Sequence, residues 1–556
     1  MKKVSTYILS AIAGAAVTLT VIAAAQPDGF RMGRSMEILV NMLRDINLFY
    51  VDEVDPDELL EDAAAGMVSH LDPYTDYIPE QDMAAFQLMT TGRYGGIGSA
   101  IRHNQSGTVF AEPYKDAPAD RAGIVAGDLI VAVDGRNATE LNADSISSML
   151  RGEPGTKVHL HVKKFYTGDT VALDIKREIV DIPGIPYYGM LNDSTGYILH
   201  SEFTEDVSND MRNAIMNLKA QGAQSLVLDY RNNGGGIMQE AVKILSFFVP
   251  RGTEVVSMRG RNSTENAVFT TQTEPLDTEI PIVVLINSGT ASAAEIVAGA
   301  LQDLDRGVVM GRRSFGKGLI QSTRPVGYNT YLKITTAKYY LPSGRCIQAV
   351  NYARQDGSAD ARQTPDSLIN EYTTRAGRKV YDGGGIMPDL KLEAEYVSSF
   401  AYKVYSKGYI HDFVDEFMRA NTGREIVPAE FRLSDEEYAD FERFMQGKDV
   451  GWNSETRRLL EMLRKAADEE RYMQNVAAHI DAIDAELDDD VQSGLELYRK
   501  ELTDLIENEI ILRRAYGRGV IQHNLADDTD ITEAVALLGN PERYREILTS
   551  QDTEKK

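Results

Sequence analysis

The sequence predicts a mixed α/β fold that is divided into several domains, and three observations lead to this prediction. Strand-like apolar runs alternate with helix-like segments over residues 180–395, an order typical of a largely parallel sheet covered by helices. Short apolar runs separated by glycine-rich turns fill residues 89–178, which favours a small β-rich module. From residue 398 to residue 556 the chain is charged and has helical periodicity, which predicts an all-helical C-terminal domain.

Composition and charge exclude some classes of protein. The chain has 556 residues, of which 43% are hydrophobic and 26% charged, as expected for a globular protein with sizeable cores. Its formal net charge of −26 argues against nucleic acid or an anionic membrane surface as the main partner. Cys346 is the only cysteine, so we expect no internal disulfide.

The N-terminal residues 1–25 carry the features of an export signal. Lys2 and Lys3 precede an apolar stretch that ends in alanines at Ala23 to Ala25, an acceptable cleavage site. The stretch is also long enough to span a membrane, with its lysines on the cytoplasmic side. We expect either a cleaved signal peptide or a retained anchor with N-terminal membrane contact. Under both alternatives the remaining domains are exported across the cytoplasmic membrane, and are periplasmic or anchored outside the cytoplasm.

Residues 34–88 are predicted to form short helices, which we interpret as a helical cap on the core. Apolar residues recur there at helical spacing. They are Met36, Leu39, Val40, Leu43 and Ile46. A turn-rich break follows at residues 71–77.

Residues 89–178 form the β-rich module, with a glycine-rich turn at its start, a turn at Asp134 and Gly135, and one helix over residues 143–150. The series A-P-A-x-x-A-G-I followed by G-D-x-I-x-x-V-D-G resembles a PDZ domain. In that family a glycine loop offers backbone N–H groups to the C-terminal carboxylate of a peptide, which adds as a strand beside the sheet. The resemblance implies that Gly96, Ile97 and Gly98 bind the carboxylate.

The α/β core contains a serine at a position suited to a nucleophile. The apolar run at residues 282–286 predicts a buried strand, and Asn287 to Gly289 end it. Small helix-forming residues follow from Ala291, so Ser292 lies where a strand gives way to a helix. A hydroxyl there lies near free backbone N–H groups and the positive end of a helix dipole, which suits an attack that produces an oxyanion.

The base that would activate this serine is predicted to be a lysine. No serine–histidine motif surrounds Ser292, whereas Lys317 lies 25 positions further along the chain. A lysine accepts a proton only in its neutral form, which burial favours. Phe315 and Leu319 are suitable apolar neighbours, and Gln321 lies four positions after the lysine, where it could orient the amine.

Two other motifs overlap this segment and fit less well. Residues 311–317 match the start of a phosphate-binding P-loop, but Gly318 stands where magnesium needs a serine or threonine, and no clear helix follows. Ser314 and Lys317 also fit the S-x-x-K motif of penicillin-binding proteins. That motif needs a helix, and the glycines in this segment argue against one.

With these residues in hand, the chain resembles the C-terminal processing peptidases, which are tail-specific serine proteases with a Ser/Lys dyad. That family pairs a serine with a lysine 25 residues later and a glutamine four after that. Ser292, Lys317 and Gln321 match all three, together with the flanking segments TASAAEI and FGKGLIQ. The resemblance covers residues 35–395.

The resemblance also implies an oxyanion hole. Residues 229–236 match the family's D-x-R-x-N-[PG]-G-G turn, with Gly234 where proline is more usual. We expect the backbone N–H groups of Gly235 and Ala293 to hold the oxyanion, and the choice between Gly234 and Gly235 stays open. The glycines of this turn would let backbone N–H groups approach an anion closely.

The C-terminal domain, residues 398–556, carries a capping box at Ser434 and Glu437. It also carries an apolar stripe that indicates either its own core or a subunit contact, so a homo-oligomer formed through this domain is an alternative. The stripe comprises Leu495, Tyr498, Leu502, Leu505 and Ile506. The eight histidines show no ligand spacing, so we expect no metal and no cofactor.

Taken together, the sequence predicts an exported serine endopeptidase that recognises and cleaves C-terminal regions of proteins. The resemblance supplies its partners, which are proteins or peptides with free, apolar C-termini. The alternative is a PDZ-type scaffold that binds tails and whose protease core is inactive or activated by a partner. A third hypothesis is an acyltransferase similar to penicillin-binding proteins, which requires acylation at Ser314.

Overall fold

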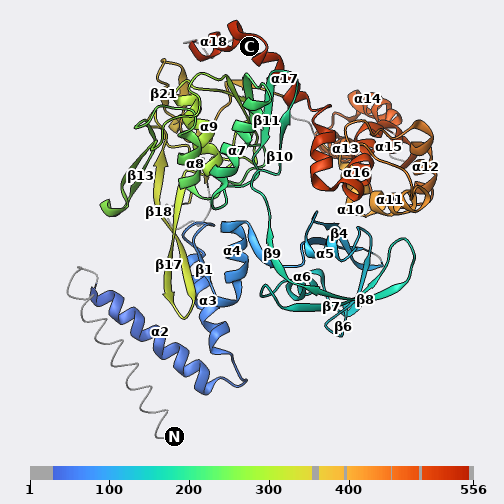
Figure 1. The fold of residues 1–556 in the computed structure, drawn as a ribbon, viewed down its shortest axis with the longest axis horizontal. Helices are drawn as coiled ribbons and strands as arrows, with labels where there is room; N and C mark the ends of the chain where they lie inside the picture. The colour runs from blue at the N-terminus through green and yellow to red at the C-terminus, as the bar shows by residue number, and fades with distance from the viewer. Residues whose placement is uncertain are drawn as a thin grey trace. The chain divides into compact units, whose positions relative to one another are not determined.

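A computed structural model of the chain is shown in Figure 1. It describes residues 29–104, 106–352, 362–393, 397–452, 454–487 and 491–549. The predicted signal peptide or anchor, residues 1–25, lies outside these residues. None of the helices that are described is both long and apolar enough to cross a membrane.

The chain divides into two compact units, which we describe separately. The first unit combines Met1–Met83 with Ile320–Thr336 and Tyr352–Arg362, and the second holds the remainder. In the first unit, helices α2 (Gly29–Phe49) and α3 (Pro56–Val68) precede the short strand β1 (Asp76–Ile78).

The apolar stripe of α2 is not buried as predicted. Met36 is 42% exposed and Val40 is 55% exposed. These two side chains are therefore not fully covered within the first unit, and the interpretation of residues 34–88 as a helical cap on the core stays a prediction.

The β-rich module contains a five-strand path in the order β3-β4-β5-β7-β8. These strands are β3 (Ser99–Asn104), β4 (Gly107–Pro113), β5 (Leu129–Val133), β7 (Lys157–Lys163) and β8 (Thr170–Lys176). Strict alternation along β7 buries Val158, Leu160 and Val162 in the module's core. The predicted helix is α6 (Ala143–Leu150).

The protease core is a six-stranded sheet in the order β10-β11-β12-β15-β16-β23. It is parallel except for β10, as the alternation of strands and helices predicted. Its strands are β10 (Tyr187–Met190), β11 (Thr195–Leu199), β12 (Ser225–Asp229), β15 (Ile282–Ile286), β16 (Val308–Gly311) and β23 (Leu390–Lys391).

Helices cover both faces of this sheet. Helices α7 (Val207–Ala220), α8 (Met238–Leu245) and α9 (Ala293–Asp303) belong to the core sequence itself. The last two helices of the chain, α17 (Thr529–Leu538) and α18 (Pro541–Thr549), pack into a cluster with side chains of β11, β12, β15 and β16. The end of the chain therefore completes the protease core.

A second sheet has the order β1-β18-β13-β14, with β17 also paired to β18. Its members are β13 (Glu254–Gly260), β14 (Ala267–Thr270), β17 (Leu319–Gly327) and β18 (Thr330–Tyr340), besides β1. Strand β17 begins two residues after Lys317.

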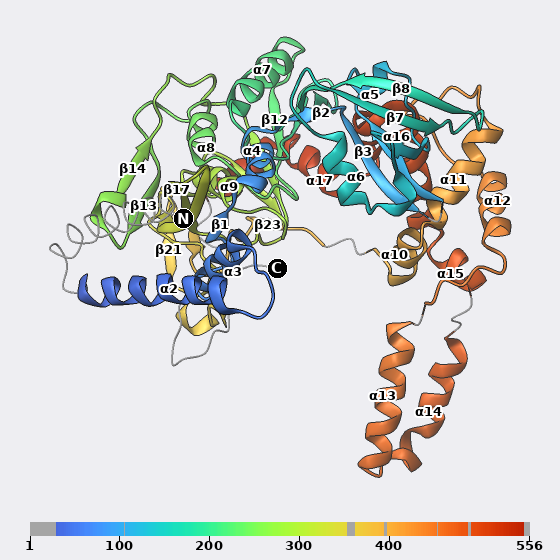
Figure 2. The same ribbon diagram turned by 90° about the horizontal axis from the view of Figure 1, so that it is seen from below.

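The rest of the C-terminal part is helical, as predicted. It comprises α10 (Ser399–Ser406), α11 (Tyr409–Ala420), α12 (Asp435–Met445), α13 (Glu455–Glu469), α14 (Met473–Glu486), α15 (Val491–Leu497) and α16 (Arg499–Asn524). Figure 2 shows α13 and α14 side by side as a helical hairpin.

Two expectations for this helical part can be compared with the structure. The capping box is present, because the Ser434 amide donates to Glu437 Oε2 at 2.8 Å and the Glu437 amide donates to Ser434 Oγ at 3.3 Å. The apolar stripe lies in the domain's own core, where Leu495, Leu502 and Ile506 are buried. Packing within the domain thus accounts for the stripe.

Candidate active site

Ser292 lies at the junction of a strand and a helix, as predicted. Strand β15 is buried throughout, the chain turns over residues 287–292, and α9 begins at Ala293. We call residues 287–292 the serine turn. Ser292 has φ 55° and ψ −118°, a conformation that non-glycine residues rarely adopt. Such strain is typical of turns that present a nucleophile between a strand and a helix.

The carboxylate of Glu295 joins this turn to the segment that carries Lys317. Its Oε2 atom accepts hydrogen bonds from the amides of Ser292 at 2.8 Å and Lys317 at 2.9 Å. Its Oε1 atom accepts hydrogen bonds from the Ser314 hydroxyl at 2.6 Å and the Gly316 amide at 2.7 Å. The backbone nitrogens of Ser292 and Lys317 therefore share one acceptor atom, which brings together the two residues that the sequence placed 25 positions apart.

Glu295 is fully buried, and no charged side chain is among these four donors. Burial raises the pKa of Glu295 to about 7, although the four hydrogen bonds favour the ionised form and oppose this rise. Sequence reasoning missed this residue. Its signal was a glutamate in the first turn of α9, three positions after the serine, which is also the spacing of a capping box.

Residues 312–318, which we call the lysine turn, form no helix. Lys317 is half-buried and Leu319 is buried, whereas Phe315 is 49% exposed and so gives the lysine less cover than predicted. The Ser314 hydroxyl is buried, donates to Glu295, and accepts a hydrogen bond from the Ile386 amide at 2.6 Å. These contacts and the missing helix argue against Ser314 as an acylated nucleophile.

The turn after β12, residues 230–236, approaches Ser292 closely. We call it the glycine turn. Gly235 has φ +95°, and a Cβ atom added there would lie 2.6 Å from Ser292 Cβ and 2.8 Å from the Ala293 nitrogen. Only glycine fits this position without displacing the serine turn. Gly234 has open space around its own Cβ position.

Asn233 holds the glycine turn in place, and sequence reasoning did not single it out. Its side chain is fully buried and donates to the carbonyl of His200 at 2.7 Å. Its Oδ1 atom accepts the amide of Gly235 at 2.8 Å. The predicted oxyanion donor Gly235 therefore has an intramolecular partner in this structure. Ala293 is the first residue of α9, so its amide has no acceptor within the helix.

Gln321 belongs to the first unit and bonds to other residues of that unit. Its Nε2 atom donates to Thr335 Oγ1 at 3.0 Å, and Thr335 Oγ1 donates to Asp72 Oδ1 at 3.1 Å. Asp72 also accepts the amide of Thr75 at 2.9 Å. The turn-rich break at residues 71–77, to which sequence reasoning assigned no chemistry, thus supports the predicted orienting residue.

The PDZ-like module has a groove of about 330 Å³. Ile97 and Gly98 line it together with residues of β3 and α6. Strand β3 ends the strand order of its sheet, so its outer edge is placed to accept another strand. Gly96, the third predicted residue, lies in β2 (Arg93–Gly96) and pairs with Glu178 of β9 (Glu178–Asp181).

Models of known families match three parts of this chain. The model of Peptidase family S41 matches residues 194–354, a PDZ domain model matches residues 109–164, and a model described as "Probable PDZ-protease, C-terminal helical domain" matches residues 400–538.

Similar proteins carry related names. The chain is 35% identical to the carboxy-terminal-processing protease of Bartonella bacilliformis, covering 58% of this chain and 72% of that protein. It is 29% identical to the carboxy-terminal processing protease CtpA of Bacillus subtilis, covering 66% of this chain and 77% of that protein. A solved structure of a photosystem II D1 C-terminal processing protease is 26% identical, with a TM-score of 0.35, and covers 64% of this chain and 92% of that chain.

Proposed function

Because the chain belongs to the carboxy-terminal processing serine proteases of peptidase family S41, we propose that Ser292 and Lys317 form its catalytic dyad. One observation carries the proposal. The amides of both residues bond to the same oxygen of Glu295, while Ser292 has the strained backbone typical of a nucleophile turn.

The dyad acts in two steps. Ser292 Oγ attacks the scissile carbonyl while Lys317 Nζ takes the hydroxyl proton. The same lysine then gives that proton to the leaving amine, which leaves an acyl-enzyme that water hydrolyses. Gln321, held by Thr335, orients the lysine in this proposal.

The oxyanion hole is assigned to the amides of Ala293 and Gly235. Both lie beside Ser292, and Ala293 begins α9, so its N–H has no acceptor within the helix and can donate to the oxyanion. The Gly235 amide bonds to Asn233 Oδ1, so we propose that this bond is exchanged for one to the oxyanion as the tetrahedral intermediate forms.

The PDZ domain supplies the substrate class in this proposal. A peptide would add as a strand along β3, and its terminal carboxylate would bind the backbone of Ile97 and Gly98. Substrates are then proteins with accessible, apolar C-termini. We place the enzyme outside the cytoplasmic membrane because residues 1–25 combine two lysines with an apolar stretch. Digestion of the intact protein by protease added to spheroplasts tests that location.

The test of the dyad is cleavage of an unstructured protein with an apolar C-terminus, with and without C-terminal amidation. We expect the wild type to cleave it, Ser292→Ala and Lys317→Ala to lose cleavage while remaining folded, and amidation to slow the wild type. Turnover by a folded Lys317→Ala variant would remove the lysine from its role. Tight binding without cleavage would support the alternative, a PDZ-type scaffold.

A further inference from the structure

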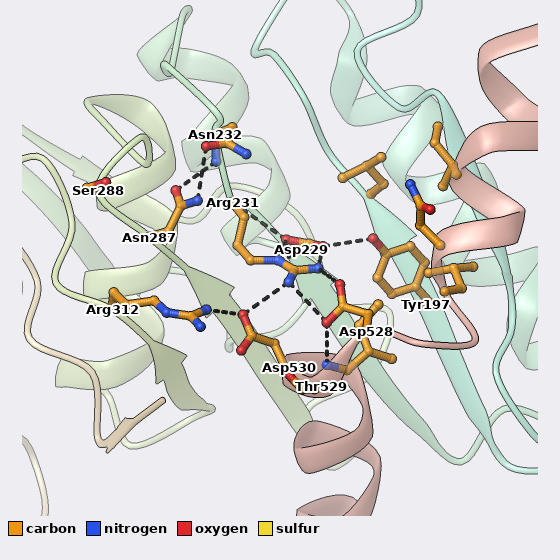
Figure 3. A pocket seen from close by; sticks show the side chains of 15 residues that line it. Tyr197, Asp229, Arg231, Asn232, Asn287, Ser288, Arg312, Asp528, Thr529 and Asp530 are labelled. Carbon is orange, nitrogen blue, oxygen red and sulfur yellow. Dashed lines mark hydrogen bonds and ion pairs between the residues drawn. The ribbon is translucent and has the colours of Figure 1, made fainter. Parts of the chain in front are cut away.

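A pocket of about 530 Å³ lies at the carboxyl edge of the protease sheet, beside the serine turn (Figure 3). Residues that follow β12, β15 and β16 line one side, among them Arg231, Asn287 and Arg312. The end of α16 and the start of α17 line the other side. Two acidic residues of this second side, Asp528 and Asp530, point toward the arginines (Figure 3).

Arg231 belongs to the glycine turn, and carboxylates surround its largely buried guanidinium. Its Nη2 and Nη1 atoms donate to the two oxygens of Asp528 at 2.8 and 3.2 Å, which is a bidentate pair. Its Nη1 also donates to Asp530 Oδ2 at 3.1 Å, and its Nε to Asp229 Oδ1 at 3.0 Å. The first turn of α17 and its cap thus hold the segment that leads to Gly235.

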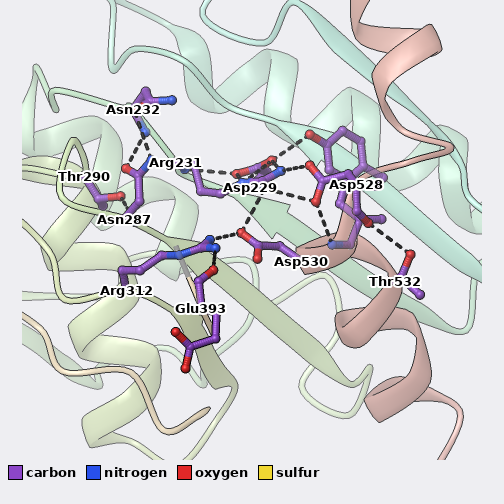
Figure 4. A network of polar contacts seen from close by, with 12 residues as sticks. Asp229, Arg231, Asn232, Asn287, Thr290, Arg312, Glu393, Asp528, Asp530 and Thr532 are labelled. Atoms are coloured by element: carbon purple, nitrogen blue, oxygen red, sulfur yellow. Dashed lines mark hydrogen bonds and ion pairs between the residues drawn. The ribbon is translucent and has the colours of Figure 1, made fainter. Parts of the chain in front are cut away.

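Asp530 also reaches the lysine turn. Its Oδ2 atom accepts a hydrogen bond from Arg312 Nη1, and its side chain is 5% exposed (Figure 4). Arg231 lies four residues before Gly235, and Arg312 lies five residues before Lys317. One carboxylate therefore joins the two turns that carry the proposed oxyanion donor and the proposed base.

The serine turn is tied to the same edge. The backbone N–H of Asn232 donates to Asn287 Oδ1 at 2.9 Å, and the side-chain Nδ2 of Asn287 donates to Asn232 Oδ1 at 3.0 Å. The Gly289 amide also donates to Asn287 Oδ1 at 3.0 Å. Arg231 precedes Asn232 directly, so a shift of the guanidinium would be passed to the serine turn through this reciprocal pair.

Helix α17 is anchored firmly enough to serve as a reference for these turns. Ile531, Ala534 and Leu537 are buried in the cluster formed with the protease sheet. Asp528 caps the helix by accepting the Ile531 amide at 3.0 Å. The two carboxylates therefore lie at the start of a firmly packed helix.

From this geometry we propose that Asp528 and Asp530 are positioning residues for the peptidase reaction. They act through Arg231 and Arg312 and keep the glycine, serine and lysine turns in register. The inference rests on the proposed function, because it assigns the turns the roles proposed there. Under this proposal α17 and its cap support catalysis, although neither Asp528 nor Asp530 contacts a reacting atom.

The test uses the full-length chain with Asp528→Asn, Asp530→Asn and their combination. Asparagine keeps the shape but removes the carboxylates that pair with Arg312 and Arg231, and in the double variant Arg231 keeps only its pair with Asp229. We expect kcat to fall by about 10- to 100-fold with KM little changed, because the turns are displaced while peptide binding is intact. The matched control is Asp527→Asn, since Asp527 is the preceding residue and pairs with Arg432 instead. This control should keep wild-type kcat.

Hydrogen exchange of the backbone amides supplies a readout that does not depend on proteolysis. We expect exchange at residues 230–236 and 312–318 to accelerate in the double variant and to match wild type in Asp527→Asn. Unchanged kcat and exchange in a folded double variant would overturn the inference. So would acceleration spread evenly over the whole sheet, which indicates a purely structural role.

Two further measurements distinguish failure of this inference from misfolding of the variants and from failure of the proposed dyad. If the asparagine variants do not fold, Asp530→Glu keeps the charge and moves the carboxylate by one methylene, so lower kcat in that variant supports the inference and wild-type kcat overturns it. If Ser292→Ala or Lys317→Ala retains cleavage, the proposed dyad fails, whereas local exchange still tests the role of α17.

Discussion

Two buried carboxylates hold the turns of this site, and their partners differ in charge. Glu295 accepts two backbone amides on one oxygen and an amide with a hydroxyl on the other. Asp530 binds two guanidinium groups, those of Arg231 and Arg312. Each lies in the first turn of a helix, and each joins two turns.

The difference shows how one site can combine titration with fixed geometry. Burial of a carboxylate among neutral donors makes its ionised form costly. A carboxylate between two arginines is compensated by charge and serves as a fixed bridge. Glu295, the carboxylate nearest Ser292, therefore titrates at about pH 7.

Glu295 and Asp530 both position the backbone beside Ser292. A substitution that displaces this backbone itself should therefore have the largest effect on activity. Gly235→Ala places a Cβ atom 2.6 Å from Ser292 Cβ and forces alanine to φ +95°. We expect kcat/KM to fall roughly 1,000-fold, the upper range for loss of an oxyanion donor. Peptide hydrolysis and circular dichroism measure activity and fold.

Gly234→Ala is the matched control, because the Cβ position of Gly234 has open space. We expect this variant to stay near wild-type activity. Equal losses in the two variants would mean that the turn tolerates no side chain anywhere, and would remove the special role of Gly235.

Residues of this site could be predicted where the sequence pattern that marks them is local, and not where their role depends on contacts with distant parts of the chain. Ser292 was found because an apolar strand, a turn and small helix formers are adjacent in the chain. Glu295 was missed because a glutamate among alanines predicts an exposed residue on the surface of a helix. Its burial requires the lysine turn, about twenty residues away, to fold over α9. Asp530 lies almost 300 residues from Arg231, and no local pattern links them.

The fold shows the same limit. The largely parallel sheet of the core followed from alternating patterns, and the helix at residues 143–150 was predicted at its observed bounds. The apolar stripe of α2 had correct periodicity, yet periodicity specifies a face and not what covers it. Likewise, the helical character of the last 30 residues gave no sign that α17 and α18 complete the protease sheet.

The second prediction concerns Glu295 and the pH dependence of the free energy of unfolding. The pKa of Glu295 is raised from an ordinary 4.5 to about 7, so the folded protein holds this proton more tightly than the unfolded chain. The stabilisation from this group is fully present below about pH 4.5 and is lost as the pH rises through about 7. The loss amounts to about 3 kcal/mol, of which about 2 kcal/mol falls between pH 5.5 and 8.5.

Urea unfolding at these two pH values measures that change in the free energy of unfolding. Glu295→Gln should lack this contribution, while exposed Glu274→Gln should keep the wild-type dependence. If wild type and Glu295→Gln show the same pH dependence, the Glu295 carboxylate does not titrate in this range and the prediction fails.

The smallest expected effect lies in the first unit, where the supporting contacts are only partly buried. Thr335→Val keeps the shape of the side chain but removes the acceptor for Gln321 and the donor to Asp72. One such hydrogen bond contributes about 1 kcal/mol, so kcat/KM should fall about fivefold. Thr336→Val is the matched control, because Thr336 bonds to Ser322 and not to Gln321. An equal loss in both variants would show that strand β18 as a whole, rather than the orientation of Gln321, sets the rate.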